Sequence, residues 1–231
     1  MNVIYEDNHL LVVVKPYGVP SQADETGDED MLSLCKAYIG EKYNKPGAVY
    51  LGLVHRLDRP TSGVMVFART SKAAARLSAQ IQNGTFEKTY LAVLTAMPPE
   101  SEGTLWHYLT KDEKTHIASV SDKPSANAKK AGLEYQVLAE KEGLVLVLVK
   151  LLTGRFHQIR AQFAHIGASV YGDMKYGARN VKAPLALFAS RISLDHPTTG
   201  ERMTFEAKPE GKAFGEFTSK EHLNKKWSFS W

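Results

Sequence analysis

The sequence holds a single cysteine, Cys35, among its 231 residues, so the chain cannot form an internal disulfide bond. Long hydrophobic runs are also missing, since the longest apolar run near the start, Leu10 to Val14, is too short to cross a bilayer. The N-terminus lacks the basic start and apolar core of a secretory signal. Together with the absence of repeats and low-complexity segments, these features predict a soluble protein of the reducing cytoplasm, without a membrane span.

Charge is distributed unevenly along the chain. The net charge is only +4, and the fractions of hydrophobic (43%) and charged (23%) residues are those of an ordinary globular protein. Residues 1–50 hold four Lys against eight acidic residues, whereas residues 51–91 hold six Lys or Arg against two, and residues 150–182 hold six against one. The two basic segments favour a polyanion-binding surface, although a solvated basic surface would have the same composition.

Hydrophobic periodicity and turn residues predict an α+β fold built mainly from antiparallel hairpins. Strands are expected at 2–5, 10–15, 49–54, 64–67, 86–95, 133–140, 144–152, 185–195 and 202–207, with a hairpin over 103–121. Helices are expected at 30–43, at 71–84 with Ser71 as its cap, at 156–166 and at 209–218. The segment 122–131 is expected to be a mobile basic loop, and the tail from Lys225 is left unassigned.

The most distinctive stretch runs from His55 to Gly63 and places one carboxylate, Asp58, between two arginines in a tight turn. Strand-like segments lie on both sides, so Asp58 is expected on a short loop that two strands position. A carboxylate held in this way suits nucleophilic chemistry. Taken alone, the stretch favours a structural role, in which Asp58 caps the turn and pairs with Arg56 or Arg59.

A second stretch, Leu152 to Arg160, contains Gly154 where a strand is expected to turn into a helix. The first turn of such a helix offers free backbone N–H groups. Arg160 lies one helical turn after His157 and is expected on the same polar edge of the helix, beside its apolar stripe. From there it could reach a carboxylate on an adjacent sheet loop and keep Asp58 ionised. The alternative is a helix start that binds an anion, beside a core-flanking arginine.

Tyr90 belongs to a third stretch, Glu87 to Val93, which is predicted to be a strand. A buried core tyrosine is the ordinary explanation for an aromatic residue on such a strand. An aromatic face beside a catalytic carboxylate would also suit a flipped nucleobase, because bases stack on aromatic rings.

Taken together, these stretches resemble the RluA-type RNA pseudouridine synthases. The motifs of that family occur here in order, between about residues 10 and 195: Lys15–Gly18, His55–Asp58, Thr61–Gly63, Lys88–Ala92, Gly154–Arg160 and Gly172–Gly177. Each motif alone would be weak, but the ordered set is specific. One departure is Phe156, where many relatives have threonine, and it is expected to alter packing at the helix start more than catalysis.

The resemblance implies a mixed, mostly antiparallel central sheet in two halves with flanking helices and an RNA-binding cleft. It implies that Asp58 is the nucleophile or an equivalent catalytic carboxylate, paired with Arg160. Arg56 is expected to take the place of the extruded uridine in the base stack. Tyr90 is expected to pack on the target base and to assist proton removal from its carbon 5.

Further expectations concern binding and organisation. His55, Arg155 and His157 belong to the same motifs and are expected to contact the RNA, a structured ribosomal or transfer RNA segment. The resemblance implies neither a metal nor an organic cofactor. Residues 1–231 are expected to form a single catalytic domain without a separate N-terminal RNA-binding module, acting as a monomer.

Three other functions are weighed against this one. A non-catalytic RNA-binding protein is disfavoured because Asp58, Tyr90 and Arg160 are all present. A hydrolase would need a second carboxylate, which neither distinctive motif supplies. A metal enzyme is disfavoured because the eight histidines show no close pair at ligand spacing, and His157 and His165 are expected on diverging faces of a helix.

Overall fold

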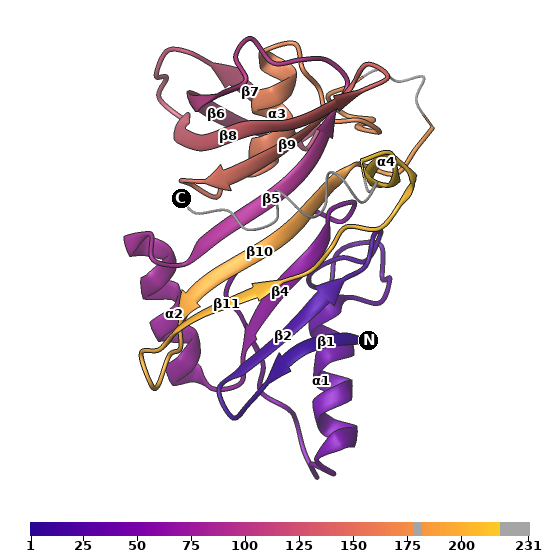
Figure 1. The fold of residues 1–231 in the computed structure, drawn as a ribbon. Helices are drawn as coiled ribbons and strands as arrows, with labels where there is room; N and C mark the ends of the chain where they lie inside the picture. The colour runs from indigo at the N-terminus through magenta and orange to yellow at the C-terminus, as the bar shows by residue number, and fades with distance from the viewer. Residues whose placement is uncertain (178–181, 218–231) are drawn as a thin grey trace. The chain divides into compact units, whose positions relative to one another are not determined.

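A computed structural model describes residues 1–177 and 182–217 (Figure 1). Its contacts group the chain into two compact units. Unit 1 combines Met1–Lys88 with Ala189–Lys208, and unit 2 combines Thr89–Phe188 with the chain from Pro209 onward. Arg179 of the basic segment and the C-terminal tail lie outside the described residues. The expectation of one catalytic domain over 1–231 stays a prediction.

The sheet of unit 1 has the strand order β1-β2-β4-β10, with β11 paired to β10 and β3 paired to β4 (Figure 1). The pairs β1–β2, β2–β4, β3–β4 and β10–β11 are antiparallel. The strands are β1 (Asn2–Glu6), β2 (Leu10–Lys15), β3 (Gly52–Leu53), β4 (Ser62–Ala68), β10 (Leu187–Asp195, the first two residues of which belong to unit 2) and β11 (Arg202–Glu206). The expected hairpins 2–15 and 185–207 are therefore confirmed.

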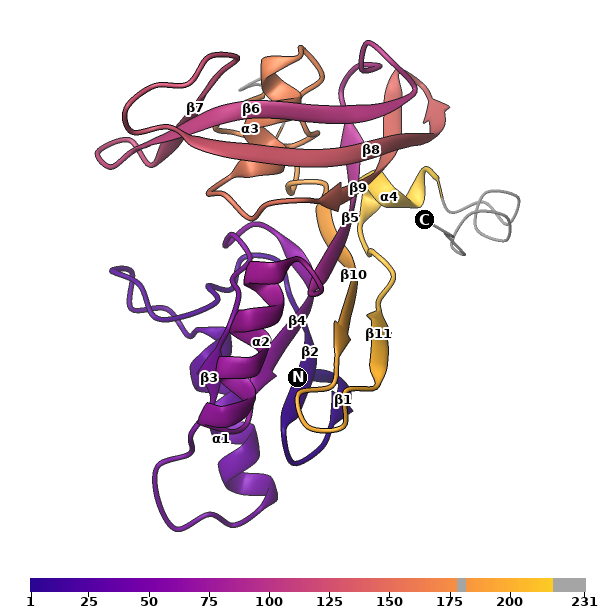
Figure 2. The same ribbon diagram turned by 90° about the vertical axis from the view of Figure 1, so that its left-hand side faces the viewer.

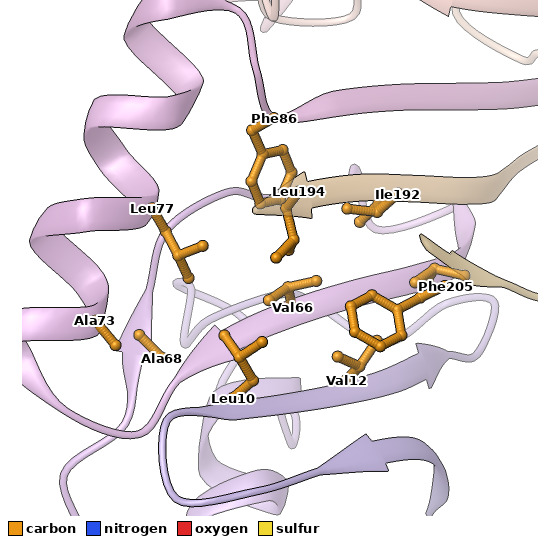
Figure 3. Packing of buried hydrophobic residues seen from close by; sticks show 11 residues of the cluster. Leu10, Val12, Val66, Ala68, Ala73, Leu77, Phe86, Ile192, Leu194 and Phe205 are labelled. Atoms are coloured by element: carbon orange, nitrogen blue, oxygen red, sulfur yellow. The ribbon is translucent and has the colours of Figure 1, made fainter. Parts of the chain in front are cut away.

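The core of unit 1 lies between this sheet and helix α2 (Ser71–Asn83), as Figure 3 shows. Leu10 and Val12 of β2 and Val66 of β4 point to the same side, because Val12 and Val66 are cross-strand partners and side chains alternate along a strand. Leu77 of α2 packs onto them, and all four side chains are completely buried. Burial on this scale is the main stabilising contribution to the unit.

Two helices of unit 1 begin where the sequence supplies a capping side chain. The Asp30 carboxylate accepts a hydrogen bond from Ser33 N at 3.1 Å at the start of α1 (Met31–Lys42). At the start of α2 the cap is Thr70, whose hydroxyl accepts from Ala73 N at 3.1 Å. The prediction that Ser71 caps this helix was wrong by one residue, because threonine at the preceding position can make the same bond. Gly84 ends α2 in the left-handed conformation, as expected.

The sheet of unit 2 has the strand order β5-β9-β8-β6-β7. Its strands are β5 (Glu87–Leu94, the first two residues of which belong to unit 1), β6 (Glu102–Asp112), β7 (Ile117–Ser121), β8 (Lys129–Lys141) and β9 (Leu144–Leu151). Figure 2 shows helix α3 (Gln158–His165) behind β6 and β8, and the inward face of β6 and β8 buries Leu109, Ala131 and Leu133. A short helix, α4 (Lys212–Gly215), follows in the last described segment.

Several boundaries differ from the prediction. β3 covers only Gly52–Leu53 of the expected 49–54, because the next pairing position, Val66 N, donates instead to the His55 ring. β8 begins at Lys129, so the expected loop 122–131 loses its last three residues to a strand. None of the helices in the described parts of the chain is long and apolar enough to span a membrane.

Candidate active site

Asp58 lies half-buried on the loop between β3 and β4, as the sequence predicts. Its backbone oxygen accepts a hydrogen bond from Thr61 N at 2.9 Å, which closes the tight turn. At the end of the loop, Gly63 has a φ of 123° and lies against the backbone of β10. A Cβ atom at this position would lie 2.6 Å from Ala189 N, so only glycine fits.

The segment that follows β2 holds the Asp58 loop in place. Gly18 N donates to Arg59 O at 3.0 Å, and the Ser21 hydroxyl both donates to Leu57 O at 2.7 Å and accepts from Leu57 N at 3.0 Å. Lys15 is completely buried, and its ammonium group donates to Arg59 O at 2.9 Å. The backbone on both sides of the carboxylate is therefore fixed by a segment about forty residues earlier in the chain.

Lys15 also acts on the electrostatics of this loop. Its ammonium group donates to two further carbonyl oxygens, those of Pro16 at 3.0 Å and Val19 at 2.6 Å. Burial lowers the pKa of Lys15 to about 8, while the Asp58 carboxylate opposes this shift. A buried cation thus interacts favourably with the Asp58 carboxylate.

The basic residues of the loop have different surroundings. The side chain of Arg59 donates to Gly18 O at 3.0 Å and pairs with Asp28, so it is tied to the acidic loop before α1. Arg56 is exposed.

His55 accepts a hydrogen bond from Val66 N at 3.0 Å through its Nε2. Burial, followed by the charge of Lys88, lowers the pKa of His55 to about 3. His55 is therefore a neutral ring whose Nε2 fixes the start of the loop.

In unit 2, the turn between β9 and α3 is organised around Gln158. The Gln158 amide oxygen accepts from Arg155 N at 2.9 Å and from the Thr153 hydroxyl at 2.7 Å, while its amide nitrogen donates to Gly132 O at 2.8 Å. The Arg155 side chain is exposed and donates from Nε to Lys130 O at 3.0 Å. The backbone N–H of Arg155 therefore has a hydrogen-bond partner within the turn and is not free to bind an anion.

His157 precedes α3 in the left-handed conformation, with a φ of 52°, so the helix begins later than the expected residue 156. Its Nδ1 lies 2.8 Å from the Tyr176 hydroxyl, which itself accepts from Ala118 N. Burial, together with the positive charge of Arg160, lowers the pKa of His157 to about 3. Phe156 lies outside the helix and stacks on the His157 ring with centroids 3.8 Å apart.

Arg160 is buried rather than placed on a polar helix edge, which corrects the expectation from its spacing. Its Nε and one terminal nitrogen donate to the two carboxylate oxygens of Asp173 at 2.7 and 2.8 Å. Asp173 also accepts from the backbone N–H groups of Lys175 and Tyr176. Burial raises the pKa of Asp173, but the hydrogen bonds from Arg160 outweigh it and hold that pKa below its ordinary value.

The predicted site residues thus fall into two sets. His55, Arg56 and Asp58 share one loop of unit 1. Arg155, His157 and Arg160 share the β9–α3 turn of unit 2, and Tyr90 is a buried residue of β5, whose residues from Thr89 to Leu94 are all buried rather than alternating. The catalytic and binding roles of these residues, and the pairing of Asp58 with Arg160, stay predictions.

Sequence reasoning gave no role to the residues that hold these two sets. Lys15 and Ser21 fix the Asp58 loop, and Asp173 and Tyr176 hold Arg160 and His157. The signal was present for three of them, because Lys15, Asp173 and Tyr176 belong to motifs that carry the family resemblance. The sequence did not show which residues these three side chains contact.

Two histidines that are far apart in the sequence lie close together in the structure. His107 and His165 lie edge to face with ring centroids 5.0 Å apart, and Asp122 lies beside both. These residues are far apart in the sequence, so ligand spacing could not have revealed them.

Comparisons with known proteins fit this geometry. Residues 9–165, which include both loops, match the family model described as RNA pseudouridylate synthase. The chain belongs to the RNA pseudouridylate synthase family. It is therefore an isomerase that converts uridine to pseudouridine in RNA, built on the α+β fold that the sequence predicts.

Individual members of the family resemble the chain over most of its length. It is 33% identical to the RNA pseudouridine synthase YlyB of Bacillus subtilis over 212 residues, which are 90% of this chain and 68% of the relative. It is 32% identical to the ribosomal large subunit pseudouridine synthase D of Pseudomonas aeruginosa, again over 90% of this chain and 68% of the relative.

Two solved human structures share the fold. Human RNA pseudouridylate synthase domain containing 4 superposes with a TM-score of 0.76 at 23% identity, over 90% of this chain and 88% of that one. Human RNA pseudouridylate synthase domain containing 1 gives a TM-score of 0.71 at 25% identity, over 90% and 83%.

Proposed function

We propose that this pseudouridine synthase modifies uridines in ribosomal RNA, with Asp58 as its catalytic carboxylate. The observation that carries the proposal is the way the Asp58 loop is fixed: hydrogen bonds from Lys15, Gly18 and Ser21 hold the backbone on both sides of a half-buried carboxylate. A fixed carboxylate is what a covalent or electrostatic step at one atom of a substrate requires. Ribosomal RNA is proposed because three of the relatives are named as synthases of the ribosomal large subunit.

The reaction defines what the site must provide. The glycosidic bond of uridine breaks, the base turns, and its carbon 5 is joined to the ribose while a proton leaves that carbon. A carboxylate near the anomeric carbon or the base ring, exclusion of water and a proton acceptor are therefore needed. The buried ammonium group of Lys15 and the Asp58 carboxylate attract each other, which suits this role.

Tyr90 and Arg160 complete the proposal. The ring of Tyr90 would stack on the extruded base and assist the departure of the proton from carbon 5. Arg160 would pair with Asp58, and Asp173 supports this role because it orients the guanidinium group through two hydrogen bonds. Arg56, which is exposed, would fill the gap left in the RNA stack, while Arg155, His55 and His157 shape the loops that receive the RNA.

The test is release of tritium from RNA labelled at carbon 5 of uridine. Asp58→Asn is expected to keep its fold and its affinity for RNA but to lose release by at least about 10³-fold, because an amide is a far weaker nucleophile than a carboxylate. The matched control is Asp195→Asn, which makes the same chemical change on β10 of the same unit and is expected to retain full release. Unimpaired release by Asp58→Asn would reject the catalytic assignment.

The substrate is tested separately. Pseudouridine is mapped in total RNA from cells with and without the gene, and loss of signal is expected at positions in the ribosomal large subunit RNA. Loss confined to transfer RNA would reject the ribosomal assignment and leave the role of Asp58 untouched. A wild-type protein that binds RNA but releases no tritium from any RNA would instead favour the non-catalytic alternative.

A further inference from the structure

A cluster of potential metal ligands lies in unit 2, formed by residues that belong to none of the family motifs. His107 comes from β6, Asp122 follows directly after β7, and His165 is the last residue of α3. His165 Nε2 lies 3.3 Å and His107 Nε2 lies 3.7 Å from Asp122 Oδ1. One ligand atom from each of the three lies within 4.8 Å of the other two.

These separations fit one ion bound by all three residues. Zinc binds imidazole nitrogen and carboxylate oxygen at about 2.0–2.2 Å in a tetrahedral arrangement, which places neighbouring ligand atoms about 3.3–3.5 Å apart. The two separations to Asp122 lie at this value or slightly above it. We propose that His107, Asp122 and His165 bind a divalent transition-metal ion of the Zn²⁺ class, with water as the fourth ligand.

The ligand set decides which ions are suitable. Two imidazoles and one carboxylate suit Zn²⁺, Co²⁺ or Ni²⁺, whereas Mg²⁺ and Ca²⁺ prefer oxygen ligands alone.

The other nitrogen of His107 contacts a buried side chain. Its Nδ1 lies 2.9 Å from the side-chain amide nitrogen of Gln162, a completely buried residue. The same amide nitrogen donates to Leu105 O at 3.3 Å and to Ala131 O at 3.4 Å, so the amide is held in place. These contacts fix the orientation of the His107 ring and leave its Nε2 on the side of Asp122.

The role that follows is structural and separate from the isomerisation. Asp122 begins the connection from β7 to β8, and its side chain is largely exposed, at 76%. A bound ion would tie the start of this connection, 122–128, to β6 and to the end of α3. Stability of unit 2 and protection of this segment from proteases would then depend on the metal.

The experiment is a titration of the full-length protein, freed of metal by a chelator, with Co²⁺ alone. The expected result is the strong visible absorption of a four-coordinate Co²⁺ site, saturating at one ion per chain and displaced by Zn²⁺. Asp122→Asn and His165→Gln change exposed or half-exposed side chains and are expected to weaken binding by at least about tenfold. Zn²⁺ is expected to raise the Tm of the wild-type protein but of neither variant.

The matched control is His9→Gln. His9 also lies edge to face with another histidine, His196, at 5.6 Å, but the ring nitrogens of His196 are engaged by Asp7 and by Thr199. This variant is expected to bind Co²⁺ like the wild-type protein. The proposal is overturned if the wild-type protein gives no four-coordinate Co²⁺ spectrum, or if both ligand variants bind with unchanged affinity.

Discussion

Lys15 is the side chain whose removal tests the electrostatics of the Asp58 loop most directly. It is completely buried, and its ammonium group is surrounded by the carbonyl oxygens of Pro16, Val19 and Arg59. Lys15→Met replaces the ammonium group with an uncharged group on an unbranched side chain of similar length. The quantity of interest is the free energy of unfolding of the wild-type protein minus that of the variant, measured as a function of pH.

The expected magnitude follows from the pKa of Lys15. Burial lowers this pKa from 10.5 to about 8 in the folded protein. A difference of one unit corresponds to about 1.36 kcal/mol, so a difference of about 2.5 units corresponds to about 3 kcal/mol. This is the free-energy cost of holding the Lys15 ammonium group charged in the folded protein, compared with the unfolded chain.

The sign of the pH dependence is fixed by proton binding. Below pH 8 the amine is protonated in both states, so the penalty is present in full and does not change with pH. Between pH 8 and 10.5 the unfolded chain binds more protons than the folded protein, and the free energy of unfolding therefore rises with pH. The wild-type protein should gain about 2 to 3 kcal/mol relative to Lys15→Met between pH 7 and pH 10.

Urea unfolding at pH 7, 8, 9 and 10 measures this difference. Lys45→Met serves as the control, because Lys45 is exposed and its removal should leave the pH dependence unchanged. Parallel curves for the wild-type protein and Lys15→Met would refute the reasoning. They would show that the three carbonyl oxygens solvate the buried ammonium group as well as water does.

Three further predictions concern other parts of the two units. Asp173→Asn should lower the free energy of unfolding by about 3–5 kcal/mol, because a buried guanidinium group loses its charged partner, and urea unfolding measures this loss. Gly63→Ala should lower the Tm strongly, because the added Cβ overlaps the backbone of β10 at a positive φ; an unchanged Tm would mean that β10 shifts at no cost. Affinity for RNA should fall as salt rises if the basic segments 51–91 and 150–182 contact phosphates, and a flat dependence in filter binding would make them solvated surface.

Local patterns predicted most of the fold. Antiparallel hairpins and the helices α1 and α2 followed from alternation, from helical spacing and from the glycine at Gly84, since each depends on neighbours in the sequence. Errors arose where a contact from elsewhere decided the boundary. β3 ends early because the His55 ring takes the N–H of Val66, and α3 starts late because His157 adopts a left-handed conformation.

The candidate site was predictable in composition but not in its contacts. The motifs placed Asp58 on a loop and Arg160 on a helix, and both placements are confirmed. The bidentate partner of Arg160, Asp173, depends on a turn whose shape no local pattern encodes. The cluster around His107 and His165 was missed for the same reason, because β6 and α3 are brought together only by the packing of unit 2.

The anchoring of the Asp58 loop limits how this protein can meet its substrate. Opening the loop would break the paired hydrogen bonds between Ser21 and Leu57 and leave the buried ammonium group of Lys15 with fewer acceptors. A segment held in this way is a poor lid, because it comes apart only with the sheet that supports it. If Asp58 acts as proposed, the nucleotide has to swing out of its helix toward a carboxylate whose loop stays in place.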